Sequence, residues 1–344
     1  MNVLSSFLLK KVTDGLKDEQ RLKIEMTNRK DLPECLHFNR ERRMPIAQVS
    51  GEDGFFIFPS QQSFENFEYS KKKLFEMGME LGPDGIGIPL LQIIDCTLSS
   101  SKTSRQKSNA KDVPYYKIFK FILKTADEPP PYAVTKIVSS KNGLILYKVP
   151  LYDICSNITT RASNYRFIGT IPTEPSSLDM ANRDSDRNLD TRVDNLNLRW
   201  KVSYSPVVTN DHYKLTLLTD RELNLLDKDE VRIAKNRMII DRSRQNGYRF
   251  VVAHYTREFS ASVFKKVSQE AHLIIGERCT DQGSFGLNRI PELTEELGCQ
   301  SLLIHYLEYM NRKRRDARRR VVRGRNFMTE TLSTDATNSA NFFA

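Results

Sequence analysis

The 344-residue chain lacks several features that would place it in a familiar class of protein. It has one tryptophan and five cysteines, an odd number spread from Cys35 to Cys299, which argues against a disulfide framework and favours a reducing compartment. No apolar run approaches the roughly 18 residues that a membrane span needs. The first residues mix charged side chains into their apolar positions, so no secretory signal is expected. These absences predict a soluble intracellular protein.

The common motifs of catalysis and metal binding are also missing. Gly82–Gly87 lacks the lysine and the strand–loop–helix setting of a phosphate-binding loop, and is expected to form a turn. Cys35 and His37 have no partner pair at zinc-ligand spacing, and convergence of Cys279, Cys299 and His305 is disfavoured. We therefore expect no metal and no cofactor. An enzyme that uses paired carboxylates has no sequence spacing to reveal it and is kept as a minority hypothesis.

Positive charge is abundant but concentrated in one short segment. The formal net charge is +10, and residues 312–325 alone hold nine basic side chains and one acid. A polyanion-binding site is therefore expected there, with nucleic acid ranked ahead of anionic lipid, and with a nuclear-import signal or a merely solvated helix end as alternatives. The candidate nucleic-acid-binding residues are Arg312, Lys313, Arg314, Arg315, Arg318, Arg319, Arg320, Arg323 and Arg325.

Hydrophobic patterning predicts a chain that is mainly β with flanking helices. Residues 196–204 alternate between apolar and polar side chains, as a half-buried strand does. Further strands are expected over 115–124, 132–139, 144–149, 165–171, 213–219, 248–255 and 271–276. Asn142-Gly143 is a hairpin turn signal. Residues 260–270 are expected to be helical, and the acidic residues 174–193 to form a loop.

Together these signals predict an α+β fold: a jelly-roll-like β-sandwich core, a helical N-terminal region and a long basic C-terminal helix. Apolar residues at helical spacing over 1–25 predict a helix packed on the body, with an in-plane membrane helix as the alternative. The expected organisation is an N-terminal region 1–112 that ends in a Ser/Lys-rich linker, a β-rich core 113–290, an amphipathic-to-basic helix 291–325 and a disordered tail 326–344.

One short motif suggests a family. An apolar strand ends at Leu218-Thr219-Asp220, Arg221 follows at once, and Gly283 and Gly286 come 63 and 66 residues after Asp220. With the strands and helix expected between them, this order resembles the thirty-kilodalton superfamily of plant-virus cell-to-cell movement proteins. The resemblance covers about residues 140–290, less than half of the chain.

The resemblance implies a non-enzymatic protein that binds single-stranded RNA or a viral nucleocapsid and carries it through plasmodesmata. It also implies contacts with host membrane surfaces and plasmodesmal proteins, self-association, and a location at plasmodesmata and the cytoplasmic membrane surface with a nuclear pool. Asp220 would be structural, and the family supplies no catalytic residue. Two alternatives are kept: a matrix-type structural protein of a negative-strand virus that binds membrane and nucleocapsid, and a nucleic-acid-processing enzyme.

Overall fold

The computed structural model describes most of the chain, with gaps between the described segments. These are residue 24 and residues 32–70, 81–82, 84–96, 114–158, 162–171, 177–183, 187–193, 195–203, 212–218, 222, 224–227, 250–258, 266–278, 287 and 290–340.

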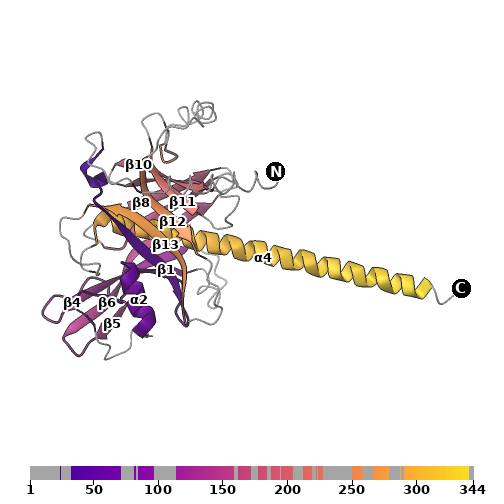
Figure 1. Ribbon diagram of the computed structural model, residues 1–344, viewed down its shortest axis with the longest axis horizontal. Helices are drawn as coiled ribbons and strands as arrows, with labels where there is room; N and C mark the ends of the chain where they lie inside the picture. Colours follow the sequence, from indigo (N-terminus) through magenta and orange to yellow (C-terminus); the bar gives the residue numbers. More distant parts are fainter. Residues whose placement is uncertain are drawn as a thin grey trace, which may run out of the picture. The chain divides into compact units, whose positions relative to one another are not determined.

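Strands dominate the described residues (Figure 1). In chain order they are β1 (Arg40–Val49), β2 (Phe55–Ile57), β3 (Leu91–Asp95), β4 (Tyr116–Thr125), β5 (Lys136–Ser139), β6 (Leu144–Ile158), β7 (Ala162–Gly169), β8 (Ser177–Arg183), β9 (Leu189–Val193), β10 (Leu196–Ser203), β11 (His212–Leu217), β12 (Val251–Arg257) and β13 (Val267–Glu277). The helical elements are the short 3-10 helix η1 (Glu34–Leu36), α2 (Gln61–Ser70) and α4 (Glu292–Ala340).

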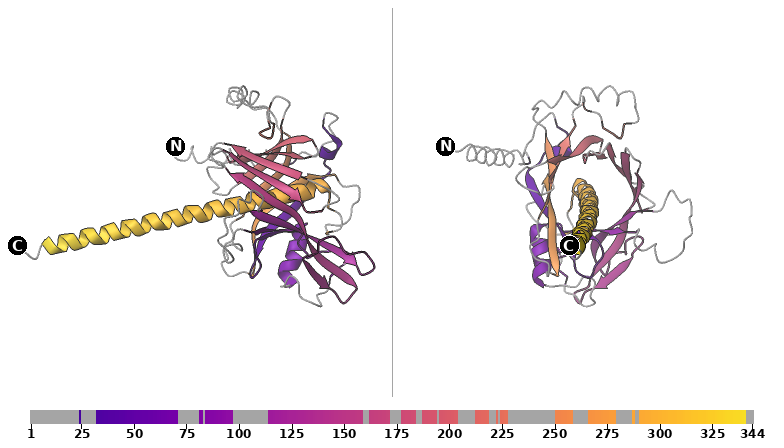
Figure 2. Two further views of the ribbon diagram at one scale, coloured as in Figure 1. Left: turned by 180° about the vertical axis from the view of Figure 1, so that it is seen from behind. Right: turned by 90° about the vertical axis from the view of Figure 1, so that its right-hand side faces the viewer.

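The strands form one antiparallel sheet that closes on itself. Its order is β4-β3-β2-β1-β13-β12-β11-β10-β9-β8-β7-β6-β5, and β4 also pairs with β6. That pairing runs from Tyr116 opposite Ile154 to Thr125 opposite Leu144, and it converts twelve strands into a closed barrel. The thirteenth strand, β5, pairs with residues 145–148 of β6. The right-hand view of Figure 2 looks into this ring. Each of the twelve strands of the ring therefore pairs with a strand on either side over at least part of its length.

The barrel interior is filled by the inward side chains of the strands and by the first turns of α4. On β10, Leu198 and Trp200 are fully buried while Lys201 is exposed, which is the alternation expected of a sheet with one face on the core. The Trp200 indole N–H donates to Gln300 Oε1 of α4 at 2.7 Å, and Gln300 Nε2 donates to Thr191 Oγ1 at 3.1 Å. Gln300 therefore satisfies the polar atoms of two strands inside the barrel.

The opposite side of the same helical turns packs on other strands. A Cβ added at Gly298 would lie 3.4 Å from Leu91 Cδ1 of β3 and 3.9 Å from Met44 Cε of β1. Thr294 Oγ1 donates to Glu277 Oε1 of β13 at 2.8 Å. Residues up to Leu302 of α4 thus contact strands from around the ring, which places this part of the helix inside the barrel.

A buried ion pair joins β1, β13 and α4. Arg42 Nε donates to Glu277 Oε1 at 2.6 Å, and Arg42 Nη1 donates to the carbonyl of Pro59 at 2.8 Å. Arg40 Nε donates to the second carboxylate oxygen of Glu277 at 2.9 Å. The Arg42 and Glu277 side chains are fully buried, so each charge is compensated by the other in the interior.

The structure corrects the predicted fold class. The jelly-roll-like sandwich is wrong, because two sheets packed face to face would leave no room for the helix that fills this interior. A helical N-terminal region is wrong for the described part of residues 1–112, where β1, β2 and β3 complete the ring together with later strands. The helix predicted over residues 1–25 lies outside the described residues, apart from the buried Ile24. The boundary predicted at residue 112 falls between two paired strands, β3 and β4.

The structure also differs from three predictions about individual segments. The loop predicted over residues 174–193 contains β8 and β9, because its inward residues alternate with the polar ones that suggested a loop. The helix predicted over residues 260–270 gives way to β13 from Val267 onward. The basic helix continues to Ala340, across residues assigned to a disordered tail. The Ser/Lys-rich linker lies outside the described residues.

Candidate functional site

The basic segment lies on the exposed part of α4. Residues 303–344 make up the second of two compact units of the chain, and residues 1–302 make up the first. Lys313, Arg314, Arg315, Arg318 and Arg319 are all exposed, and Arg312 is partly exposed. No ion pair is made by these six side chains within the described part of the chain.

Helix geometry gathers five of the arginines on one side. Successive residues turn by about 100°, so Arg312, Arg314, Arg315, Arg318 and Arg319 fall within an arc of about 160°. We call these five residues the arginine stripe. Lys313 and Asp316 fall outside this arc, with Asp316 at its border, about 40° from Arg312 and about 60° from Arg319. The ammonium of Lys313 lies 4.5 Å from the centre of the Tyr309 ring, a cation–π contact.

The stripe is electrostatically unfavourable without a partner. Arg314 and Arg318, and likewise Arg315 and Arg319, are four residues apart, and like charges at that spacing destabilise a helix by a few tenths of a kcal/mol per pair. A negatively charged ligand would remove this repulsion and accept hydrogen bonds from several guanidinium groups.

The other predicted site residues are only partly placed. Arg320, Arg323 and Arg325 lie within α4, but their side chains are outside the described residues. Leu218 is buried, and its N–H donates to the carbonyl of Asn197 at 2.8 Å. The remaining motif residues, Asp220, Arg221, Gly283 and Gly286, also lie outside the described residues, so the structure does not bring this motif together.

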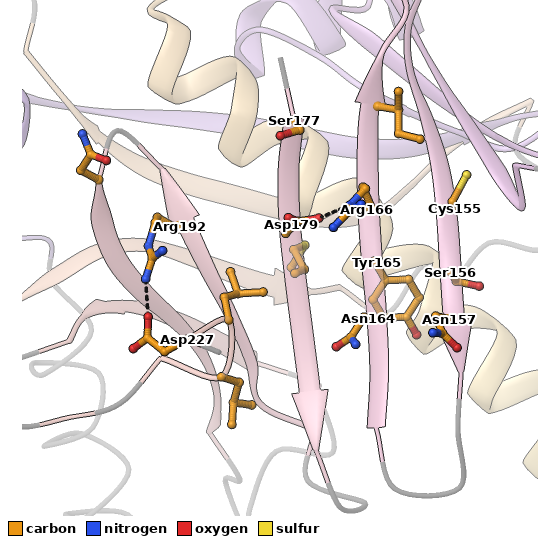
Figure 3. A pocket seen from close by; sticks show the side chains of 15 residues that line it. Cys155, Ser156, Asn157, Asn164, Tyr165, Arg166, Ser177, Asp179, Arg192 and Asp227 are labelled. Atoms are coloured by element: carbon orange, nitrogen blue, oxygen red, sulfur yellow. Dashed lines mark hydrogen bonds and ion pairs between the residues drawn. The ribbon is translucent and has the colours of Figure 1, made fainter. Parts of the chain in front are cut away.

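A second candidate, which we call the outer groove, was not predicted from the sequence. It is a hollow of about 970 Å³ on the outside of the barrel. Its floor is formed by β6, β7 and β8, and its wall by β9 and the loop 224–227 (Figure 3). The lining residues are Cys155, Ser156, Asn157, Asn164, Tyr165, Arg166, Ile168, Ser177, Asp179, Met180, Arg192, Asn195, Leu225, Leu226 and Asp227.

Strand register arranges the floor of the outer groove in rows. Asn157 lies opposite Asn164, Arg166 opposite Asp179, and Ile168 opposite Ser177. These rows offer, in turn, two amides, an ion pair, and an apolar side chain beside a hydroxyl. Figure 3 shows Arg166 and Asp179 facing each other on neighbouring strands. Their Nε and Oδ1 atoms are 3.1 Å apart, and their side chains are 67% and 37% exposed.

The wall of the outer groove is held by buried polar contacts. Asp190 is fully buried, accepts two hydrogen bonds from Arg199 at 2.5 and 2.8 Å, and accepts a third from the Leu225 N–H at 2.9 Å. Asn224 Nδ2 donates to the carbonyl of Thr191 at 2.9 Å. These bonds fix the loop 224–227 on β9.

The same loop positions an ion pair at the rim of the groove. Arg192 Nη2 donates to Asp227 Oδ1 at 2.6 Å, and Arg192 Nε donates to Asn197 Oδ1 at 2.9 Å. Bonded on both sides, the guanidinium of Arg192 is oriented before any ligand arrives. The alternation of buried Leu178 and Met180 with Ser177 and Asp179 was the sequence signal for this floor.

One titratable cluster lies on the outside of β1, β12 and β13. Glu258 Oε1 is 2.6 Å from His272 Nδ1 and 2.8 Å from Arg43 Nη2. The hydrogen bond from His272, together with the positive charges of His272 and Arg43, lowers the pKa of Glu258. In the described segments, no group of three or more His, Cys, Asp or Glu side chains could hold a metal ion.

None of the helices in the described ranges is both long enough and apolar enough to cross a bilayer.

The fold and the two sites define a class: a closed antiparallel barrel around the start of a helix, with a polar groove on its outer face and a cationic helical segment later in the chain. The chain belongs to the DIA1 family, whose profile matches residues 39–313. The matched range contains the whole outer groove and ends at the second residue of the basic segment, so four stripe arginines lie beyond it. No solved structure matches the chain.

The relatives are yeast proteins. The chain is 66% identical to "Protein DIA1" of Saccharomyces cerevisiae over 315 residues, which cover 92% of this chain and 93% of the relative. It is 31% identical to "Uncharacterized protein YOR385W" of the same yeast over 301 residues, covering 87% and 97% of the two chains. "Uncharacterized protein YNL165W" is 26% identical over 308 residues, covering 81% and 72%.

These relatives overturn the predicted family. The resemblance to plant-virus movement proteins was wrong, and with it the functions of cell-to-cell transport and viral matrix assembly and the location at plasmodesmata. The match rested on a three-residue motif, an adjacent arginine and a loosely spaced glycine. Such a pattern arises by chance in a β-rich chain, where acids often follow strands because they cap the turn.

Proposed function

We propose that this DIA1-family protein is a non-catalytic binding protein whose arginine stripe holds the phosphate backbone of single-stranded RNA. The single observation that supports the proposal is the arrangement of Arg312, Arg314, Arg315, Arg318 and Arg319 on one exposed side of α4. Phosphate contacts carry most of the affinity of proteins that bind nucleic acid without sequence preference.

The composition of the helix favours nucleic acid over a lipid surface. A helix that lies in a membrane interface needs an apolar face opposite its cationic one. Among residues 311–319, Ala317 is the one apolar side chain, and Lys313 and Asp316 also fall outside the arc of the arginines. Arginine also suits RNA better than lysine does, because its planar guanidinium bonds phosphate through two N–H groups and stacks on unpaired bases.

Fluorescence anisotropy with a labelled single-stranded RNA of mixed sequence tests the proposal. The stripe variant changes Arg314, Arg315, Arg318 and Arg319 to glutamine, which removes four charges while keeping good helix propensity. The control changes four exposed barrel lysines, Lys136, Lys141, Lys201 and Lys266, to glutamine and therefore has the same net charge.

We expect the stripe variant to bind RNA about a hundredfold more weakly at low salt, and the lysine variant to bind nearly as well as the wild type. Equal losses in the two variants would show that net charge alone drives binding. Wild-type binding to vesicles of anionic phospholipid without binding to RNA would refute the proposal. RNA shortened during incubation with magnesium would refute its non-catalytic part.

A further inference from the structure

The outer groove has a lining chemistry that selects a ligand unlike RNA. Two arginines, Arg166 and Arg192, are matched by two aspartates, Asp179 and Asp227, within salt-bridge distance. The groove therefore carries no excess charge with which to attract a polyanion. Its remaining polar side chains are amides and hydroxyls, which both donate and accept hydrogen bonds.

We propose that the outer groove binds a neutral, polyhydroxylated chain, which in chemical class is an oligosaccharide. Each sugar hydroxyl is a donor and an acceptor at once. Exposed carboxylate oxygens of Asp179 accept from hydroxyls, and guanidinium N–H groups of Arg166 donate to them. Asn157 and Asn164, directly opposite each other, offer both functions side by side. Ile168, 45% exposed, provides an apolar contact for the C–H face of a sugar ring.

The dimensions of the groove suit a chain better than a single small molecule. The three rows of the floor are two residues apart along each strand, which is about 7 Å from row to row. The volume of about 970 Å³ lies at the upper end of the range for ligand pockets, about 300–1,000 Å³. Chemically different rows at this spacing can contact successive units of one ligand.

The groove is also built in advance of binding. The Asp190 carboxylate holds the loop 224–227 through the Leu225 N–H, and the loop in turn presents Asp227 to Arg192. Little side-chain entropy is therefore lost at the wall when a ligand enters. The centre of the floor is a rigid sheet face, because β7 is paired along both edges, with β6 over residues 163–169 and with β8 over residues 162–168.

That same pairing disfavours a peptide. An extended peptide gains affinity by adding a strand to a free sheet edge. The central strand of the floor, β7, pairs with β6 along one edge and with β8 along the other, so a peptide lying over it would meet side chains only and leave most of its own backbone groups unpaired.

A filling variant and a matched control test the proposal in the full chain. Ser177→Trp places an indole on the groove floor from an exposed strand position, where aromatic residues are well tolerated. Ser139→Trp makes the same change at an exposed position of β5, outside the groove. Asp179→Asn removes the floor carboxylate charge without changing side-chain size. The probes are neutral hexasaccharides of glucose, mannose and N-acetylglucosamine, measured by isothermal titration calorimetry.

We expect at least one hexasaccharide to bind at micromolar to millimolar concentration, with a loss of about tenfold or more in Ser177→Trp, a smaller loss in Asp179→Asn, and no loss in Ser139→Trp. The bound sugar should also slow alkylation of Cys155, which lines the groove, relative to Cys35 outside it. RNA affinity should be unchanged in Ser177→Trp, which separates this inference from the proposed function.

Three results would overturn the inference. The first is no heat and no protection of Cys155 with any hexasaccharide at millimolar concentration. The second is sugar binding that Ser177→Trp leaves intact. The third is tighter binding of a neutral extended peptide than of every sugar tested.

Discussion

Removing the charge of Glu277 should strongly destabilise the barrel. The Glu277 carboxylate is almost completely buried and accepts hydrogen bonds from Arg42, Arg40 and Thr294, so it joins β1, β13 and α4. Glu277→Gln keeps the shape but leaves the fully buried Arg42 guanidinium without its counter-charge. Breaking a buried ion pair from one side typically costs about 3–5 kcal/mol.

The structure shows where this free energy comes from. Arg40 is 21% exposed, so its contact with Glu277 is screened by water and contributes on the order of 0–1 kcal/mol. The hydrogen bond from Thr294 contributes about 1 kcal/mol. Most of the loss is therefore the cost of burying Arg42 unpaired, and Thr294→Val should cost only about 1 kcal/mol.

Urea denaturation measures the free energy of unfolding, with Trp200 as the reporter. It is the one tryptophan of the chain and is fully buried. The double variant Arg42→Met, Glu277→Leu should be more stable than Glu277→Gln, because it leaves no uncompensated charge. A loss below about 1 kcal/mol in Glu277→Gln, or a double variant no better than the single one, would refute this reasoning.

Three further predictions concern packing, polar satisfaction and pH. A Cβ at Gly276 would lie 2.2 Å from Cδ2 of the buried Phe38. Gly276→Ala should therefore lower the free energy of unfolding by about 1–3 kcal/mol. An unchanged melting temperature would contradict this contact. Gln300→Leu leaves the Trp200 indole N–H unpaired in the interior and should cost about 1–3 kcal/mol in urea denaturation, whereas a neutral effect would argue against this pairing. The pKa of Glu258 is lowered from 4.5 in the folded state, so its contribution to the free energy of unfolding is present above pH 4.5 and is lost as the pH falls through the folded pKa. Glu258→Gln should therefore flatten the acid side of a plot of stability against pH. An unchanged plot would count against the His272 contact.

The sequence predicted individual strands better than their assembly. The alternation around Trp200 and the Asn142-Gly143 turn indicated β10 and the β5–β6 hairpin, because both signals are local. Closure of the ring depends on pairings such as β1 with β13, whose residues Arg42 and Glu277 are 235 positions apart. The inward Arg42 also interrupts the apolar pattern of β1, since its charge is balanced only by a strand from the other end of the chain.

The candidate sites also differ in how local their sequence signals are. The basic residues of α4 are contiguous, so composition alone indicated them, and the stripe follows from helix geometry. The outer groove needs β6, β7, β8 and β9 side by side and the loop 224–227 held against Asp190. These residues are spread over positions 155–227, so no short motif contains them, and the acids and amides of residues 174–193 are typical of a loop.

The salt dependence of RNA binding tests the central claim most directly. Five arginine–phosphate contacts on single-stranded RNA predict a slope of about −3.5 for log affinity against log salt concentration. The stripe variant should reduce the magnitude of this slope by about 3, and the four-lysine control should leave it unchanged. If the stripe variant keeps both the wild-type affinity and the wild-type slope, α4 is not the binding surface and the proposed function is wrong.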